Sequence, residues 1–134
     1  MKNNTPIFRG IATALITPLT ADGIDYAQFG KLIDWQIDQG INALVICGTT
    51  GESSTLSDAE HRRAIAFACE KVNGRVPVIA GTGSNETAYA VELTKSACAD
   101  GAMPSWWSPP TTTRPPRTAW WPCTTPSPTP APSR

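Results

Sequence analysis

The chain is predicted to fold as an α/β protein with a parallel sheet, because short apolar runs alternate three times with helical segments. The runs cover Ile11 to Thr17, Ala43 to Cys47 and Val76 to Ala80, and their starts lie about 32 residues apart. That spacing leaves room for one helix after each strand. The runs are continuously apolar, as expected of strands that are covered on both faces. We therefore expect three consecutive strand–helix units.

Each helical segment begins and ends with a recognisable signal. A cap candidate precedes each segment and a glycine follows it, as is typical of helix ends. The second segment opens with Ser57-Asp58-Ala59-Glu60, which matches a capping box. The expected caps are Asp25, Ser57 and Asn85, and the expected stops are Gly40, Gly74 and Gly101.

The composition changes abruptly after Gly101. Residues 103–134 hold 10 of the 13 prolines and 4 of the 5 tryptophans, and they contain no Asp or Glu. Such a segment has little means of forming a packed core. We therefore expect two parts, a folded partial domain over residues 1–101 and a disordered Pro-rich tail over residues 102–134.

A shifted reading frame accounts for this change. When the codons from Ala102 to Arg114 are read again from each third base, they permit Asp-Ala-Ile-Leu-Val-Val-Thr-Pro-Tyr-Tyr-Asn-Lys. The two valines follow because tryptophan has a single codon and Ser108 is read from a codon that begins with TC. This frame supplies a fourth apolar strand where the alternation requires one, so we hypothesise a single-base deletion near codon 102. In the printed frame the third strand is expected to be an open edge, which predicts marginal stability and aggregation.

Charge and composition exclude several classes of function. Residues 1–101 carry 8 basic and 11 acidic side chains, with no basic stripe for nucleic acid. The sequence contains no apolar run suited to a signal peptide or a membrane span, so a cytosolic protein is expected. The four cysteines form no C-x-x-C pair and His61 is the only histidine. Reduced, mostly buried thiols are expected, with no zinc site and no cofactor.

Two polar loops follow the second and third predicted strands. The first is Gly48-Thr49-Thr50-Gly51-Glu52, and the second is Gly81-Thr82-Gly83-Ser84-Asn85. In parallel α/β folds such loops form the active-site face. Paired hydroxyls beside glycine N–H groups suit a small carboxylate or a proton relay. The alternatives are a tight turn whose threonines bond only the backbone, and a turn that leads into a helix cap.

Other candidate residues have plainer interpretations. His61 is a possible ligand-binding or catalytic imidazole, although a lone histidine in the first turns of a helix is more often at a surface or interface. Thr17, before Pro18, is interpreted as a strand end. The three lysines beyond the first strand lie on predicted helices, so none is placed as a desolvated nucleophile.

Three motifs resemble a known family. They are Phe8-Arg9-Gly10-Ile11-Ala12-Thr13-Ala14-Leu15-Ile16-Thr17-Pro18, Gly48-Thr49-Thr50-Gly51-Glu52-Ser53-Ser54-Thr55-Leu56 and Pro77-Val78-Ile79-Ala80-Gly81-Thr82-Gly83-Ser84-Asn85. Together they are similar to the 4-hydroxy-tetrahydrodipicolinate (dihydrodipicolinate) synthases, over about a third of a family member. The paired threonines favour these synthases over the related N-acetylneuraminate lyases, which usually have serine in place of Thr49.

The resemblance implies the first three βα units of a (β/α)8 TIM barrel. It implies a lyase of bacterial lysine biosynthesis that condenses pyruvate with L-aspartate 4-semialdehyde through a Schiff base. Thr49 matches the family's proton-relay threonine, and Thr50 matches the threonine that holds the pyruvate carboxylate. The Schiff-base lysine, its partner tyrosine and the substrate-binding arginine have no counterpart in this sequence, so the chain alone is expected to be inactive.

The resemblance also implies a homotetramer with a lysine-inhibited site. The residues that align with this inhibitor region are Ser54, Asp58, His61, Asn85 and Tyr89. Asp58 and Tyr89 depart from the His and Glu of lysine-sensitive members. A different class of function remains as an alternative, namely a non-catalytic protein whose Pro-rich tail, Pro126-Ser127-Pro128-Thr129-Pro130-Ala131-Pro132, recruits a partner.

Overall fold

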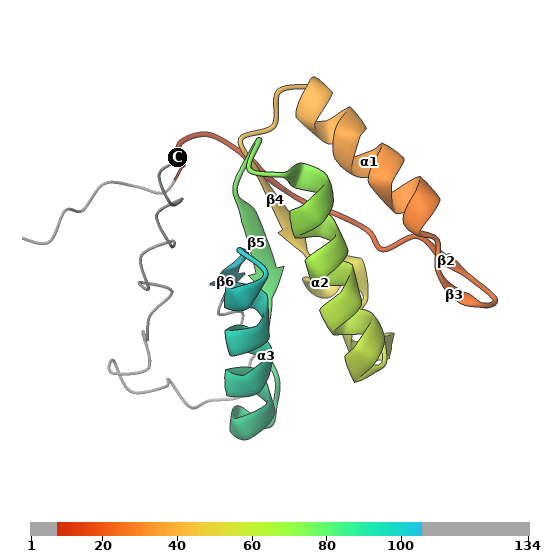
Figure 1. The fold of residues 1–134 in the computed structure, drawn as a ribbon, viewed down its shortest axis with the longest axis vertical. Coiled ribbons are helices and arrows are strands. Elements are labelled where there is room, and N and C mark those ends of the chain that lie inside the picture. The colour runs from red at the N-terminus through yellow and green to blue at the C-terminus, as the bar shows by residue number, and fades with distance from the viewer. Residues whose placement is uncertain (1–7, 106–134) are drawn as a thin grey trace, which may run out of the picture.

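A computed structural model describes residues 8–105 and shows the predicted α/β architecture. A four-stranded parallel sheet has its strands in chain order (Figure 1). A short antiparallel pair, β2 and β3, follows the first strand. The strands are β1 (Ala12–Ala14), β2 (Leu19–Thr20), β3 (Gly23–Ile24), β4 (Ala43–Ile46), β5 (Val78–Gly81) and β6 (Met103–Ser105). The helices are α1 (Tyr26–Asp38), α2 (Asp58–Val72) and α3 (Thr87–Ala99), with single 3-10 turns η1 (Thr49–Gly51) and η2 (Ser53–Thr55).

The hydrophobic core lies between the sheet and the helices. Leu44 and Ile46 of β4 are fully buried, and they belong to one hydrophobic cluster with apolar side chains from all three helices. Helix α2 contacts α1, α3, β4 and β5, so it lies at the centre of the packing. The fully buried helix side chains include Phe29, Ile33, Ile65 and Leu93. Burial of a side chain of this size contributes about 1.5–3 kcal/mol, so these residues contribute strongly to holding the helices against the sheet.

Local signals explain where α1 and α2 begin. The Asp25 carboxylate accepts a hydrogen bond from the Gln28 N–H at 3.0 Å. Ser57 and Glu60 form both halves of the predicted capping box, which confirms that motif. The expected Asn85 cap is wrong. Helix α3 begins one residue later than that cap allows, with Glu86 as N-cap and no side-chain cap bond, and Ser84 Oγ accepts the Glu86 N–H at 3.2 Å just before the helix.

The predicted glycine stop at Gly101 directs the chain into a fourth strand. Gly101 has a φ of +89°, a left-handed conformation that glycine adopts without strain. The Ala102 N–H then donates to the Ala97 carbonyl at 2.9 Å, and Met103 pairs with Ile79 of β5. The third strand is therefore not an open edge, because β6 covers it. A fourth strand was expected from the other reading frame. Residues of the printed sequence form a strand at that position of the sheet.

The remaining tail expectations concern residues outside the described range. The predicted disorder of the Pro-rich segment stays a prediction, although the described residues extend four positions past Gly101. The expectation of reduced thiols is wrong for Cys98, which is disulfide-bonded. Cys47 and Cys69 are free, and burial raises the pKa of the Cys47 thiol to about 12.

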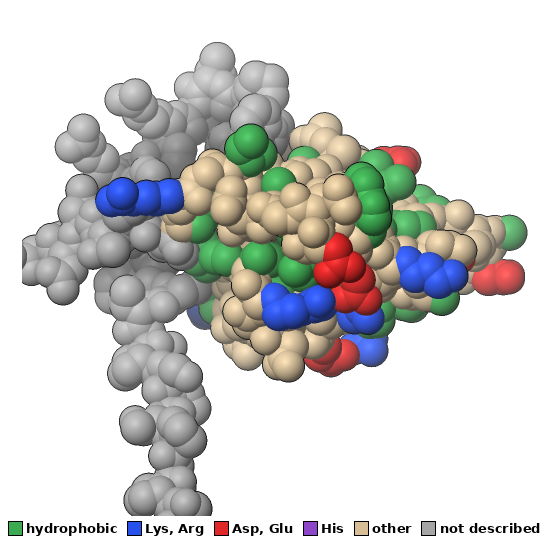
Figure 2. All heavy atoms as spheres, turned by 90° about the horizontal axis from the view of Figure 1, so that it is seen from above, with side chains coloured by type: hydrophobic (Ala, Val, Ile, Leu, Met, Phe, Trp, Pro, Cys, Tyr) green, Lys and Arg blue, Asp and Glu red, His purple; other side chains and the backbone are tan. Residues whose placement is uncertain are grey.

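Charged side chains of both signs are interspersed on the face shown in Figure 2. This distribution accords with a sequence of 11 basic and 11 acidic residues. Within residues 8–105, no helix is long and apolar enough to span a bilayer.

Candidate active site

Both predicted polar loops begin at the carboxyl ends of neighbouring parallel strands. Strand β4 ends at Ile46 and leads through Cys47 and Gly48 into η1, while β5 ends at Gly81. Because β4 and β5 pair in parallel, with Ile46 opposite Ala80, the two loops emerge at the same edge of the sheet. This edge is the one that carries the functional groups in parallel α/β folds.

The backbone is packed tightly where the two loops meet. Cys47 has a φ of +54°, which is uncommon for a residue other than glycine, and its carbonyl group lies against Gly81. A Cβ on Gly81 would lie 2.7 Å from the Cys47 carbonyl carbon and 3.0 Å from Gly48 Cα. A glycine is therefore required at position 81 for the end of β5 to approach the start of the threonine turn.

The threonine pair presents two hydroxyls that the fold does not use. The 3-10 turn is closed by backbone bonds, from the Gly51 N–H to the Gly48 carbonyl and from the Glu52 N–H to the Thr49 carbonyl. Thr49 and Thr50 are exposed, and their hydroxyls have no hydrogen-bond partner within residues 8–105. The alternative in which these threonines only bond the backbone is therefore not observed. Both groups are free to bind a ligand or pass a proton.

Thr17 is a contributor that sequence reasoning missed. Its side chain is only 5% exposed, and its hydroxyl donates to the Gly51 carbonyl at 2.7 Å. The bond joins residues 34 positions apart. The available signal was a polar residue ending an apolar strand, which had been interpreted only as a strand stop.

The second loop is only partly available to a ligand. Thr82 is almost fully buried, and its hydroxyl oxygen accepts a hydrogen bond from the Thr94 hydroxyl at 2.9 Å. This contact ties the loop to α3. Gly83 and Asn85 are exposed, so the side chains that this loop presents are those of Ser84 and Asn85.

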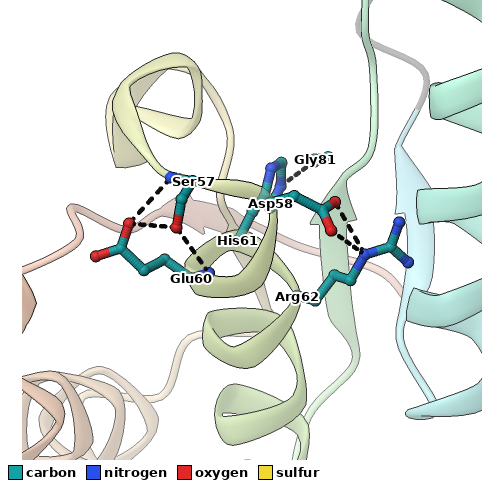
Figure 3. A network of polar contacts seen from close by, with 6 residues as sticks. All are labelled: Ser57, Asp58, Glu60, His61, Arg62 and Gly81. Atoms are coloured by element: carbon teal, nitrogen blue, oxygen red, sulfur yellow. Dashed lines mark hydrogen bonds and ion pairs between the residues drawn. The ribbon is translucent and has the colours of Figure 1, made fainter.

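His61 is buried, which corrects the expectation of a surface or interface residue. Its ring lies 5% exposed on α2, and Nε2 is 2.9 Å from the Gly81 carbonyl oxygen (Figure 3). In the tautomer that carries the Nε2 proton, His61 donates to that carbonyl. Burial lowers the pKa of His61, although the Gly81 contact and the Asp58 charge oppose the shift. The imidazole is thus a neutral tether between α2 and the end of β5.

The structure joins two members of the predicted inhibitor region. The Asp58 carboxylate is paired with Arg62 Nε, at 2.9 and 3.0 Å (Figure 3), and the Tyr89 side chain influences the same carboxylate. The Arg62 and Tyr89 contacts lower the pKa of Asp58, while burial is the main cause of the raised pKa of Tyr89. Ser54 and Asn85 are exposed and take no part in this cluster.

No feature of the described chain indicates a metal centre. Residues 8–105 contain no group of three His, Cys, Asp or Glu side chains placed to hold a metal ion.

These observations define a class of protein. The described chain is a run of consecutive parallel βα units with a pair of exposed hydroxyls after a strand at the carboxyl edge of the sheet, the edge that forms the active site in α/β barrels. Residues 7–110 match the model of the dihydrodipicolinate synthetase family. The chain belongs to that family.

Individual relatives support membership of the same family. The chain is 57% identical over 97 residues to a 4-hydroxy-tetrahydrodipicolinate synthase of Acetivibrio thermocellus, covering 72% of this chain and 33% of the relative. A synthase of Nitratidesulfovibrio vulgaris is 54% identical over 99 residues, again covering 72% of this chain and 34% of the relative. The chain thus spans about a third of the length of the curated relatives that it matches.

Solved structures give the same result. The crystal structure of dihydrodipicolinate synthase from Aquifex aeolicus matches with a TM-score of 0.70 at 47% identity, covering 72% of this chain and 33% of that one. The chloride-inhibited synthase of Acinetobacter baumannii, complexed with pyruvate, matches with a TM-score of 0.67 at 48% identity, covering 69% of this chain and 32% of that one. The predicted family and the partial TIM-barrel fold are confirmed.

Proposed function

We propose that these βα units belong to a lyase that condenses pyruvate with L-aspartate 4-semialdehyde to 4-hydroxy-tetrahydrodipicolinate, in lysine biosynthesis. The observation that carries the proposal is the pair of exposed, unpartnered hydroxyls of Thr49 and Thr50 at the carboxyl edge of the sheet. It is supported by family membership and by relatives named for this activity.

The chemistry divides between this chain and the rest of a barrel. Pyruvate condenses with a lysine amine, water leaves, and loss of a methyl proton gives an enamine that attacks the aldehyde carbon. We assign Thr49 to the proton relay and Thr50 to binding of the pyruvate carboxylate. No lysine of the described chain lies at the sheet edge, so residues 1–134 alone are expected to show no turnover.

A fusion protein tests this proposal. Residues 1–101 of this chain would be joined to the part of the Acetivibrio thermocellus synthase that follows its matched segment, and condensation would be followed by consumption of both substrates. Activity is expected, because the donor is 57% identical over the replaced segment. A folded fusion with no condensation would contradict the proposal.

Variants of the fusion separate the two threonine roles. Thr49→Val is expected to lower kcat by about 10²–10⁴-fold, the range typical of general acid–base catalysis. Thr50→Val is expected mainly to raise KM for pyruvate. Thr55→Val is the matched control, because its exposed hydroxyl bonds only the nearby Glu52 carbonyl. Equal kinetics for all three variants would exclude the assigned roles.

Two alternative functions can be tested with the same fusion protein and with a peptide from this chain. Cleavage of N-acetylneuraminate by the fusion, without condensation, would indicate the related lyase activity. Capture of a partner by a peptide of residues 103–134 would instead support a binding protein. The matched relatives favour neither alternative.

Assembly and inhibition also remain proposals. We infer a cytoplasmic homotetramer for the whole enzyme, while a solved relative described as a monomeric variant shows that the family also includes other states. The ion pair of Asp58 with Arg62 lies in the expected inhibitor region, where the Tyr89 side chain also lowers the pKa of Asp58. We therefore propose weak or absent inhibition by lysine, which titration of the fusion with lysine would measure.

A further inference from the structure

We propose that Thr17 is the positioning residue of the threonine turn, holding Thr49 and Thr50 in the geometry that a ligand requires. The catalytic role of Thr17 in this inference rests on the proposed function. Its role in holding the turn does not depend on that function. It begins from one buried hydrogen bond, between the Thr17 hydroxyl and the Gly51 carbonyl at 2.7 Å.

The turn lies directly on the end of the first strand. A Cβ on Gly51 would lie 3.1 Å from the Leu15 carbonyl oxygen and 3.2 Å from Thr17 Oγ1. Gly51 itself is buried. Its backbone therefore packs against the first βα unit, and Thr17 supplies the polar contact across that junction.

The two ends of the turn are held in different ways. At its start, the left-handed Cys47 and the close approach of Gly81 fix Gly48 by steric contact. At its end, the Thr17 hydroxyl fixes Gly51 by a hydrogen bond. Thr49 and Thr50 lie between these points and have no side-chain bonds of their own within the described chain. The end at Gly51 is the one whose restraint depends on a single side-chain group.

Removal of the Thr17 hydroxyl leaves a buried acceptor without a donor. Thr17→Val keeps the shape of the side chain, so the main change is the unsatisfied Gly51 carbonyl, a group that is costly to leave unpaired. The turn is expected to open locally about ten times more often, because a tenfold change in an equilibrium corresponds to the lower end of the free-energy cost of an unpaired buried acceptor. Thr17→Ser keeps the hydroxyl and is expected to restore the closed turn.

Thiol alkylation of the full 134-residue chain tests the opening without any need for activity. Cys47, 1% exposed and next to Gly48, reports on the turn, while the half-buried Cys69 on α2 reports on general unfolding. Mass spectrometry after timed exposure to iodoacetamide gives the alkylation rate at each cysteine. Thr17→Val is expected to raise the Cys47 rate about tenfold with Cys69 unchanged, and Thr17→Ser to return it to the wild-type value.

Thr20→Val is the matched control. Its exposed hydroxyl bonds only the local Gly23 carbonyl, so the Cys47 rate is expected to stay unchanged. Three results would overturn the proposal. They are an unchanged Cys47 rate in Thr17→Val, an equal rise at both cysteines, or unprotected Cys47 in the wild-type chain.

The fusion protein adds the catalytic readout. There, at a temperature where every variant is folded, Thr17→Val is expected to lower kcat about tenfold, with rescue by Thr17→Ser. An unchanged kcat in an active fusion would refute the positioning role. An inactive fusion would instead count against the proposed function, while the alkylation result would still decide the role of Thr17 in holding the turn.

Discussion

Gly81 is the position where the smallest possible change should have the largest effect. Gly81→Ala adds one methyl group, and that methyl would lie 2.7 Å from the Cys47 carbonyl carbon, 3.0 Å from Gly48 Cα and closer still to the Cys47 oxygen. All of these atoms belong to the backbone, so no side chain can rotate away. The ends of β4 and β5 must separate to relieve the overlap.

The expected cost follows from this geometry. Overpacking a well-packed interior typically costs about 1–3 kcal/mol, and we expect a value near 3 kcal/mol because only backbone atoms can yield. Small proteins have m-values of about 1–3 kcal/mol/M in urea, so the unfolding midpoint should fall by about 1–3 M. Far-UV circular dichroism of the full chain in urea measures this midpoint.

Gly48→Ala provides the matched control. Gly48 has an extended backbone with φ −76° and ψ −171°, and its added Cβ would meet only Val45 Cγ1 at 3.4 Å. Its midpoint should stay close to that of the wild type, or rise slightly through the lower entropy of the unfolded chain. Equal midpoints for the two variants would refute the close approach of the two loops.

Three further predictions concern helix ends and charges. Ser57→Ala should destabilise the chain by about 1 kcal/mol in urea unfolding, because it removes the α2 capping box. Burial lowers the pKa of His61 in the folded state. The stability that the neutral form of His61 contributes is therefore complete above about pH 6.5 and falls as the pH drops through the folded-state pKa. His61→Gln should abolish this pH dependence of the stability. Asp34→Asn breaks ion pairs of 2.7 Å with Lys71 and Arg75, but these groups are about two-fifths exposed, so the cost should be at most about 1 kcal/mol and should vanish in 1 M salt.

Local sequence signals predicted most of the fold. The Asp25 cap, the Ser57 capping box and the Gly101 stop are set by residues within a few positions, so their patterns can be recognised in the chain. The apolar runs likewise predicted the parallel strands. Asn85 is not the cap of α3, and Ser84 instead forms a local side-chain turn with the Glu86 N–H, a choice between neighbouring polar residues that residue types alone do not rank.

The site was predicted only in part, because its support comes from contacts across the fold. The loop with Thr49 and Thr50 was found from its place after a strand. The bond from Thr17 to Gly51 and the contact of His61 with Gly81 join residues 34 and 20 positions apart. Only packing of the units against one another brings such pairs together, so spacing along the chain carries no sign of them.

Sequencing the source gene across codons 99–104 tests the central claim most directly, namely that residues 1–101 begin a lyase barrel whose remaining units are encoded in another frame. One additional base is expected, which would continue Ala102 into Asp-Ala-Ile-Leu-Val-Val-Thr-Pro-Tyr-Tyr-Asn and restore a downstream lysine and arginine. Confirmation of the printed frame, with no Thr-Pro-Tyr-Tyr segment in any frame that follows, would contradict the claim.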